Sequence, residues 1–310
     1  MSPQSYSLPS ILITVLLLNN TCSAGAIADN KVPLACSSSS VTALDVGNSK
    51  EHSRVEIRDT EVRILKSQYV DQVYEIDIWF PKSYETKTKT YPVVYVLDAE
   101  YNFGCVSYIA RRLIKNGDIP EVLLVGIAYN SSYDEFQKQR IRDCTPPSTI
   151  HGYHTGGVED FILFLRNELI PFINDNYRTI PVDRTITGHS IGGLFACYVL
   201  FRHSDLFNRY IIVSPSLWYS NEIVFEYEKE YANSHRDLEA SIYLSTGMDE
   251  SERMVRTSRY FTGVLSGRGY NSLRLEAVMA EGEHHRSLFA QAFTKGMRFV
   301  FSDVAVGEQK

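Results

Sequence analysis

The pattern of apolar and polar side chains changes once along the chain, near Pro92. Residues 55–64 and 74–79 alternate apolar with polar positions, a period typical of half-exposed antiparallel strands. Beyond Pro92, apolar residues stand in short unbroken runs, as in strands buried on both faces of a sheet. These runs are 93–97, 122–127, 185–187, 210–213, 242–245 and 273–278. We expect the alternating pair to form the first edge of the sheet that the runs continue.

Stretches with helical periodicity separate the runs, and the clearest of them is 159–170. Alternation of strand and helix requires right-handed crossovers, so the pattern predicts an α/β fold with a mostly parallel central sheet and helices on both faces. Two connections, 129–158 and 218–238, are longer than ordinary loops. They would line a binding site or pack on their own aromatic residues.

The N-terminal residues 8–18 form an apolar run that is too short to span a bilayer as a stable helix. Small residues at Ala24 and Ala26 follow, which predicts a signal peptide over residues 1–26 and a secreted or periplasmic protein. A buried N-terminal strand or a lipid anchor on Cys22 is the alternative. Residues 27–50 are Ser-rich and predict a flexible linker, which leaves one domain over 51–310.

Composition narrows the range of partners. The 310 residues carry a net charge of −6 and offer no basic face for phosphate groups. Nucleic acid and anionic membranes are therefore excluded as partners, whereas a small neutral or cationic ligand is not. We expect no stable membrane insertion after signal removal, and the oligomeric state stays open. Cys36, Cys105, Cys144 and Cys197 remain after cleavage and allow three disulfide pairings, although Cys197 is expected to pack as a small apolar residue.

A candidate nucleophile follows one of the buried runs. Residues 188–193 read GHSIGG and lie between the segment 184–187 and the apolar run 194–198. In a nucleophile elbow, a serine occupies a strained turn between strand and helix, and the flanking glycines let the two approach closely. Ser190 is therefore the predicted nucleophile of an α/β-hydrolase fold. A structural glycine turn is the alternative.

A serine hydroxyl needs a base and a carboxylate that orients the base, and this fold orders them serine, acid, histidine. Asp249 and Glu250 follow the run 242–245, and His284 and His285 follow the run 273–278. Both pairs stand at the carboxyl ends of strands, where active-site loops belong. The sequence alone does not show which of the two carboxylates is the acid or which of the two histidines is the base.

A metal site at residues 283–285 is disfavoured, because consecutive side chains point in different directions and the sequence offers no third ligand cluster. The serine mechanism itself requires no cofactor. We therefore expect neither a metal nor another cofactor.

Three further motifs carry a family resemblance. Residues 94–98, VYVLD, are similar to an oxyanion strand, residues 142–146, RDCTP, to a loop motif, and residues 214–218, SPSLW, to a turn motif. All three motifs belong to the putative-esterase family of α/β hydrolases, the group that includes esterase D and the enterobactin and bacillibactin esterases. The resemblance covers about residues 91–301 and implies a serine ester hydrolase.

The resemblance also implies roles for single residues. It places the acid at Glu250 and the base at His285, although some members of the family work with a serine–histidine dyad. The oxyanion hole would use the backbone N–H groups of Ile191 and Glu100. Donors of this kind typically contribute about 10²–10³ in turnover.

Two side chains are predicted to contact the substrate. Arg142 could meet a negative charge and Trp218 could stack on an aromatic ring. Arg142 could equally form a structural ion pair with Asp143. The predicted reaction is two-step acyl transfer on small or medium soluble esters, with siderophore lactones as the sharpest candidate and acylated sugars as the runner-up. An acyltransferase of the same fold or a non-catalytic ligand-binding module is the alternative.

Overall fold

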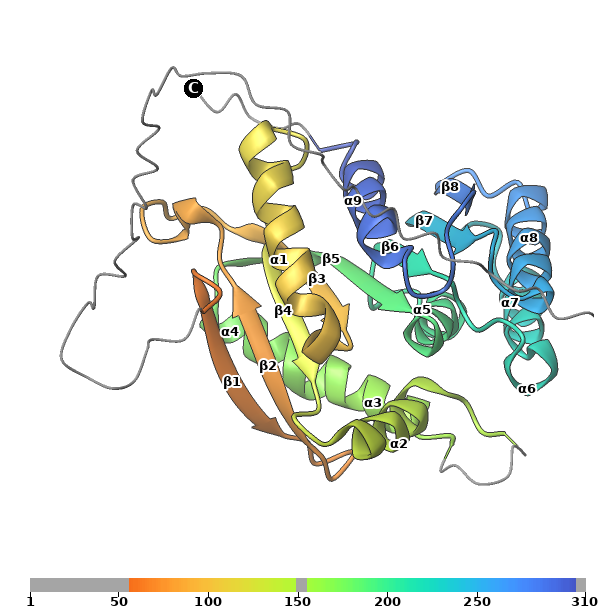
Figure 1. Cartoon of the computed structure of the whole chain (residues 1–310), viewed down its shortest axis with the longest axis horizontal. Helices are drawn as coiled ribbons and strands as arrows, with labels where there is room; N and C mark the ends of the chain where they lie inside the picture. Colours follow the sequence, from red (N-terminus) through yellow and green to blue (C-terminus); the bar gives the residue numbers. More distant parts are fainter. Residues whose placement is uncertain (1–55, 149–154, 305–310) are drawn as a thin grey trace, which may run out of the picture. The chain divides into compact units, whose positions relative to one another are not determined.

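An eight-stranded sheet forms the centre of the protein in the computed structural model, which describes residues 56–148 and 155–304 (Figure 1). The predicted signal peptide 1–26 and linker 27–50 lie outside the described residues. The strands are β1 (Thr60–Lys66), β2 (Val73–Trp79), β3 (Tyr91–Leu97), β4 (Leu123–Ala128), β5 (Thr179–His189), β6 (Arg209–Val213), β7 (Ala240–Gly247) and β8 (Leu273–Ala280). Their order across the sheet is β1-β2-β4-β3-β5-β6-β7-β8.

Strand direction follows the two sequence patterns. β2 pairs antiparallel with β1 and β4, whereas the other neighbouring strands pair in parallel. The expected mostly parallel sheet with an antiparallel edge is confirmed, and each unbroken apolar run overlaps one strand from β3 to β8. The predicted strand 55–64 is wrong at its start. Residues 58–59 form a turn in which Asp59 has a φ of 62°, so pairing begins at Thr60.

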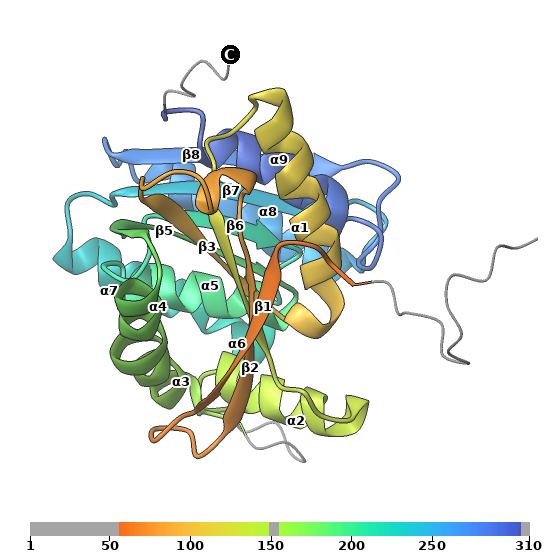
Figure 2. The same cartoon turned by 90° about the vertical axis from the view of Figure 1, so that its left-hand side faces the viewer.

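Helices lie on both faces of the sheet, as the alternating pattern predicts (Figures 1 and 2). They are α1 (Ala99–Asn116), α2 (Tyr133–Cys144), α3 (Val158–Phe164), α4 (Ile170–Asn176), α5 (Ile191–Arg202), α6 (Tyr219–Glu222), α7 (Val224–Ser234), α8 (Glu252–Gly267) and α9 (Phe289–Val300). The side chains of β3 alternate between two cores: Val93, Tyr95 and Leu97 pack with α3, α4, α5, α7 and α8, whereas Val94 and Val96 pack with α1 and α9.

The predicted helix 159–170 exists, but it has an irregular centre. α3 runs into one π-helical turn over Leu165–Leu169, and α4 continues the helix to Asn176. Pro171 stands at the start of α4 and has no N–H to donate to the preceding turn. The change of hydrogen-bond spacing at this proline is therefore the physical reason for the widened turn.

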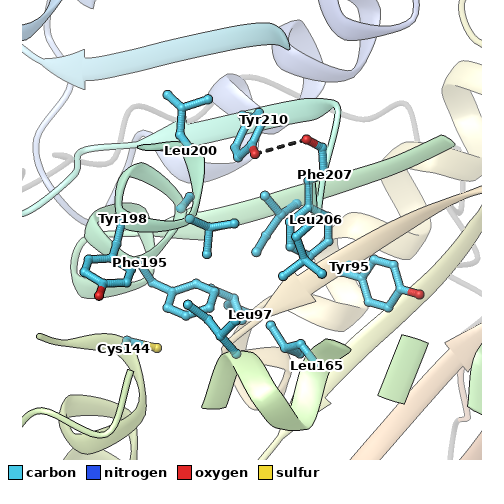
Figure 3. Close-up of a cluster of buried hydrophobic side chains, with 14 of the residues drawn as sticks. Tyr95, Leu97, Cys144, Leu165, Phe195, Tyr198, Leu200, Leu206, Phe207 and Tyr210 are labelled. Atoms are coloured by element: carbon cyan, nitrogen blue, oxygen red, sulfur yellow. Dashed lines mark hydrogen bonds between the residues drawn. The ribbon is translucent and has the colours of Figure 1, made fainter. Parts of the chain in front are cut away.

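The helix that follows the candidate nucleophile is anchored in the core. Phe195 and Leu200 of α5 are fully buried, and they lie in one cluster with Leu97 of β3 (Figure 3). In the same layer, the Tyr210 hydroxyl donates to the backbone oxygen of Phe207 at 3.1 Å. This packing fixes α5 and with it the residue at its N-terminus.

The cysteines divide by position. Cys197 is fully buried on α5, which confirms its expected role as a small apolar residue, and Cys144 is buried in the same cluster. Cys105, Cys144 and Cys197 are free thiols with respect to one another. Cys36 lies outside the described residues, so a disulfide to it stays a prediction.

Candidate active site

Ser190 occupies the sharp turn between β5 and α5. Its φ of 60° and ψ of −114° lie outside the regions that serine prefers, which is the strain typical of a nucleophile elbow. A Cβ at residue 188 would collide with the backbone oxygen of Gly192, so only glycine fits there. A Cβ at Gly193 would come within 3.0 Å of Pro215 Cα. The turn therefore holds the serine hydroxyl clear of both elements.

The two predicted oxyanion donors stand at helix starts on neighbouring parallel strands. Ile191 begins α5 after β5, and Glu100 is the second residue of α1 after β3. The first N–H groups of a helix have no intrahelical acceptor, so they are available to an anion. The Glu100 carboxylate accepts the backbone N–H of Tyr129, and burial raises the pKa of this carboxyl. The oxyanion role of both N–H groups stays a prediction.

A buried ion pair joins the turn before α1 to the elbow. Arg140 of α2 binds Asp98 through two hydrogen bonds of 2.6 and 2.8 Å. Arg140 Nη2 also donates to the backbone oxygen of His189 at 2.8 Å. Both side chains are buried, and the Asp98 carboxylate neutralises the charge of Arg140. Removing one partner of such a pair typically costs about 3–5 kcal/mol.

Arg142 also has a carboxylate partner. Its Nε donates to Asp143 Oδ1 at 2.6 Å, and the buried Asp143 accepts from the Tyr74 hydroxyl at 2.6 Å. The structural ion pair, one of the two interpretations of Arg142, is therefore present. Arg142 is not among the residues that line the cavity beside Ser190. Substrate contact by Arg142 stays a prediction.

His285 and Glu250 face each other. His285 Nδ1 lies 2.7 Å from Glu250 Oε2. The Glu250 side chain is only 1% exposed, and its second oxygen accepts from Ser214 Oγ at 2.5 Å and from Gly247 N at 2.9 Å. Burial opposes ionisation of Glu250, but the hydrogen bonds from His285, Ser214 and Gly247 outweigh it and lower the pKa of this carboxyl. Glu250 is therefore an ionised carboxylate that accepts a hydrogen bond from the Nδ1–H group of His285.

The neighbouring residues have other contacts. The Asp249 side chain is exposed, and its backbone N–H donates to the Glu283 backbone oxygen at 3.0 Å. His284 is also exposed, and its Nδ1 accepts the backbone N–H of Arg286 at 3.2 Å. Of the two pairs, Glu250 and His285 are the members that contact each other, and their catalytic roles stay a prediction.

Ser190, Glu250 and His285 line one open cavity of about 470 Å³. The remaining lining residues are Ser216, Trp218, Asp249, Ser251, Arg253, Met254, His284 and Arg286. Ser190 Oγ lies 3.4 Å from Ser216 Oγ. Among the described residues no hydrogen bond links Ser190 to His285, and catalytic hydrogen bonds commonly tighten only when substrate binds.

His189 was missed by sequence reasoning, although it adjoins the nucleophile. Its Nε2 lies 2.7 Å from the backbone oxygen of His285, and the two imidazole rings lie 4.5 Å apart. Because a carbonyl only accepts, Nε2 of His189 must carry the proton. Burial, and next the proximity of His285, lower the pKa of His189 to about 4. His189 is therefore a neutral donor that holds the His285 backbone.

The two long connections differ in what they contribute. From the segment 218–238 only Trp218 lines the cavity, while Tyr231 of α7 is buried in the core. The Phe and Tyr residues of this segment pack on other helices and not on one another, as Tyr227 does on Tyr198 of α5 and Phe225 on Phe261 of α8. In the segment 129–158, Arg140 of α2 donates a hydrogen bond to the backbone oxygen of His189, the residue before Ser190.

Neither a metal cluster nor a membrane helix is found in residues 56–148 and 155–304. No three His, Cys, Asp or Glu side chains of these ranges gather closely enough to hold a metal ion. No helix of these ranges is both long and apolar enough to cross a bilayer.

Ser190, Glu250 and His285 follow each other in the chain order of α/β hydrolases and stand after β5, β7 and β8. The protein is thus a serine hydrolase with the α/β-hydrolase fold. Residues 67–300 match the family described as Putative esterase, and the chain belongs to this family. It is a carboxylic ester hydrolase, as the sequence motifs predict.

Several relatives have names that specify a substrate. The ferri-bacillibactin esterase BesA of Bacillus subtilis (strain 168) is 30% identical over 262 residues, 78% of this chain and 90% of that protein. The siderophore triacetylfusarinine C esterase of Aspergillus fumigatus is 25% identical over 262 residues, 74% of this chain and 89% of that protein.

Solved structures with the same fold include the BES protein from Bacillus cereus, with a TM-score of 0.75 and 29% identity over 82% of this chain and 99% of that one. An IroE-like serine hydrolase from Shewanella oneidensis has a TM-score of 0.71 and 26% identity, with coverage of 79% and 81%.

Because the folded protein keeps His189 neutral, we expect this histidine to make the free energy of unfolding depend on pH. The unfolded chain binds a proton on this histidine below a pKa of 6.5, and the folded protein only below about 4. Stability is therefore lost as pH falls through that window, by up to roughly 3 kcal/mol from this group. His189→Gln should remove this increment. Urea unfolding of both proteins between pH 7 and about pH 4 measures it, and parallel stability curves would contradict the expectation.

Proposed function

We propose that the protein hydrolyses esters through an acyl-enzyme on Ser190, with His285 as general base and Glu250 as the carboxylate that orients it. The observation that carries this proposal is the 2.7 Å contact between His285 Nδ1 and Glu250 Oε2, beside a serine held at a φ of 60°. Because Nδ1 donates to the carboxylate, the lone pair on Nε2 is left to accept a proton.

In the first step, Ser190 Oγ attacks the ester carbonyl carbon and its proton passes to His285 Nε2. The backbone N–H groups of Ile191 and Glu100 stabilise the oxyanion. The C–O bond then breaks, and the leaving alcohol takes the proton from Nε2. Water attacks the acyl carbon and gives its proton to Nε2, and Ser190 recovers that proton as the acid is released.

The strained serine favours catalysis over a non-catalytic binding module. A residue in such a backbone conformation costs on the order of 1–3 kcal/mol, and here the strained residue is the serine that faces the same cavity as His285 and Glu250. An acyltransferase would use the same acyl-enzyme with an alcohol acceptor in place of water. Product analysis in excess alcohol separates the two reactions.

For the substrate we propose small or medium soluble esters, with siderophore lactones as the most specific candidate. One relative is named a ferri-bacillibactin esterase and another a siderophore triacetylfusarinine C esterase, and the aromatic Trp218 lines the cavity. Acylated sugars are the second candidate. A catecholate trilactone that is cleaved with a kcat/KM no higher than that of a short aryl ester would leave a general carboxylesterase.

Removal of the nucleophile tests the reaction. Ser190→Ala should lower p-nitrophenyl ester hydrolysis by about 10³-fold or more and abolish fluorophosphonate labelling, because the attacking oxygen is gone. His285→Ala should be far more damaging than the matched change His284→Ala. Full labelling of Ser190→Ala would disprove the assignment.

Amide substitutions at Glu250 and at its neighbour Asp249 test the role of the carboxylate. Glu250→Gln should lower kcat by a factor on the order of 10²–10⁴, since the amide oxygen cannot stabilise the imidazolium as a carboxylate does. Asp249→Asn, the matched control, should stay near the wild-type rate. Equally small losses for both variants would favour a serine–histidine dyad.

Export is proposed from residues 1–26. When the full chain is expressed in a bacterium, the protein outside the cytoplasm should begin near residue 27, because the signal peptide is removed. Intact mass and N-terminal sequencing of the periplasmic and culture fractions measure this. Uncleaved protein confined to the cytoplasm would count against export.

A further inference from the structure

Two arginines line the cavity beside Ser190. Arg253 comes from α8, and Arg286 comes from the loop that follows β8. Both side chains are exposed, and no described carboxylate lies within 4.0 Å of either guanidinium. Arg140 and Arg142, which precede them in the chain, are instead paired with carboxylates. The positive charge available at the cavity therefore comes from Arg253 and Arg286.

Arg253 is held in place without the use of its N–H groups. Its guanidinium carbon lies 4.2 Å from the centroid of the Trp218 ring. The indole N–H of Trp218 in turn donates to Met254 Sδ at 3.0 Å, which fixes the ring. A guanidinium that stacks on an aromatic face keeps its donor edge free for a planar anion.

Other arginines of α8 show that Arg253 is different. Arg256 pairs with Glu222, and Arg268, next to the helix end, pairs with Glu228. Arg259 of α8 is also exposed and has no described carboxylate within 4.0 Å, but it does not line the cavity. Arg253 packs on an aromatic ring, and of these arginines it is the one that lines the cavity.

Negative charge in the cavity is limited. Glu250 is 1% exposed and already binds His285, Ser214 and the Gly247 N–H. Asp249 is the other carboxylate among the lining residues. Two unpaired cations therefore face a single free carboxylate, in a chain whose net charge is −6.

We propose that Arg253 and Arg286 form an anion subsite that selects esters with a carboxylate or phenolate group near the scissile bond. The proposal rests on ester hydrolysis at Ser190 and names the substrate class of the same site. Arg253 and Arg286 act as specificity-determining residues, because they bind charge on the substrate and take no part in bond cleavage. Their attraction is screened by salt.

The experiment compares charged and neutral esters of matched shape. One pair, 4-acetoxybenzoate and 4-acetoxybenzamide, carries the charge on the leaving group. A second pair, the mono-4-nitrophenyl ester of adipic acid and 4-nitrophenyl hexanoate, carries it on the acyl chain. The ratio of kcat/KM for the charged and the neutral ester is measured for each pair, so that a variant's general loss of activity cancels.

Arg253→Gln and Arg286→Gln should each lower this ratio by about twofold to fivefold in at least one pair, as expected for exposed ion pairs. The double variant should lower it by about tenfold. Added salt should reduce the wild-type ratio toward that of the double variant.

The matched control is Arg256→Gln, which removes a paired arginine from the same helix outside the cavity. Its ratio should equal that of the wild type. Ratios that are unchanged in the double variant for both pairs would overturn the subsite while leaving ester hydrolysis intact. Absence of hydrolysis of all four esters would instead count against the proposed reaction.

Discussion

The buried pair of Arg140 and Asp98 is the interaction on which the geometry of the site depends. Asp98 lies between β3 and α1 and is the N-cap residue of the helix, two residues before the proposed oxyanion donor Glu100. The same guanidinium reaches the backbone oxygen of His189, one residue before the nucleophile. The ends of β3 and β5, which are neighbours in the sheet, are thereby held in a fixed position relative to each other. Because a buried charge cannot be left without its partner, this relative position is maintained by a large energetic penalty.

The arrangement of elements could be predicted because it depends on periodicity. Alternating and unbroken apolar segments indicate half-exposed and buried strands, and GHSIGG between strand and helix indicates an elbow. The choice between Asp249 and Glu250 could not be predicted in this way. It depends on the Asp249 N–H bond to the Glu283 backbone, which joins two loops far apart in sequence and leaves Glu250 facing His285.

Charge was the least predictable property. The net charge of −6 favours neutral or cationic ligands, and motif reasoning directed attention to Arg142. In the fold, Asp143 neutralises Arg142, and the free cations of the cavity come from Arg253 and Arg286. Arg253 lies in no motif, so only its contact with Trp218 distinguishes it from other surface arginines. Local pairing, which sequence does not show, therefore decides which charges a ligand meets.

The members of the site differ in how they are attached to the sheet. Ser190 follows β5 directly, and Glu250 is held by Ser214 and Gly247 at the ends of β6 and β7. His285 comes from an irregular loop after the edge strand β8, and its backbone oxygen is bound by His189. Loops tolerate changes of length that strands do not. The loop that carries His285 is therefore the part of the proposed site where a change of length would disturb the sheet least, whereas Ser190 and Glu250 are fixed to the strand ends.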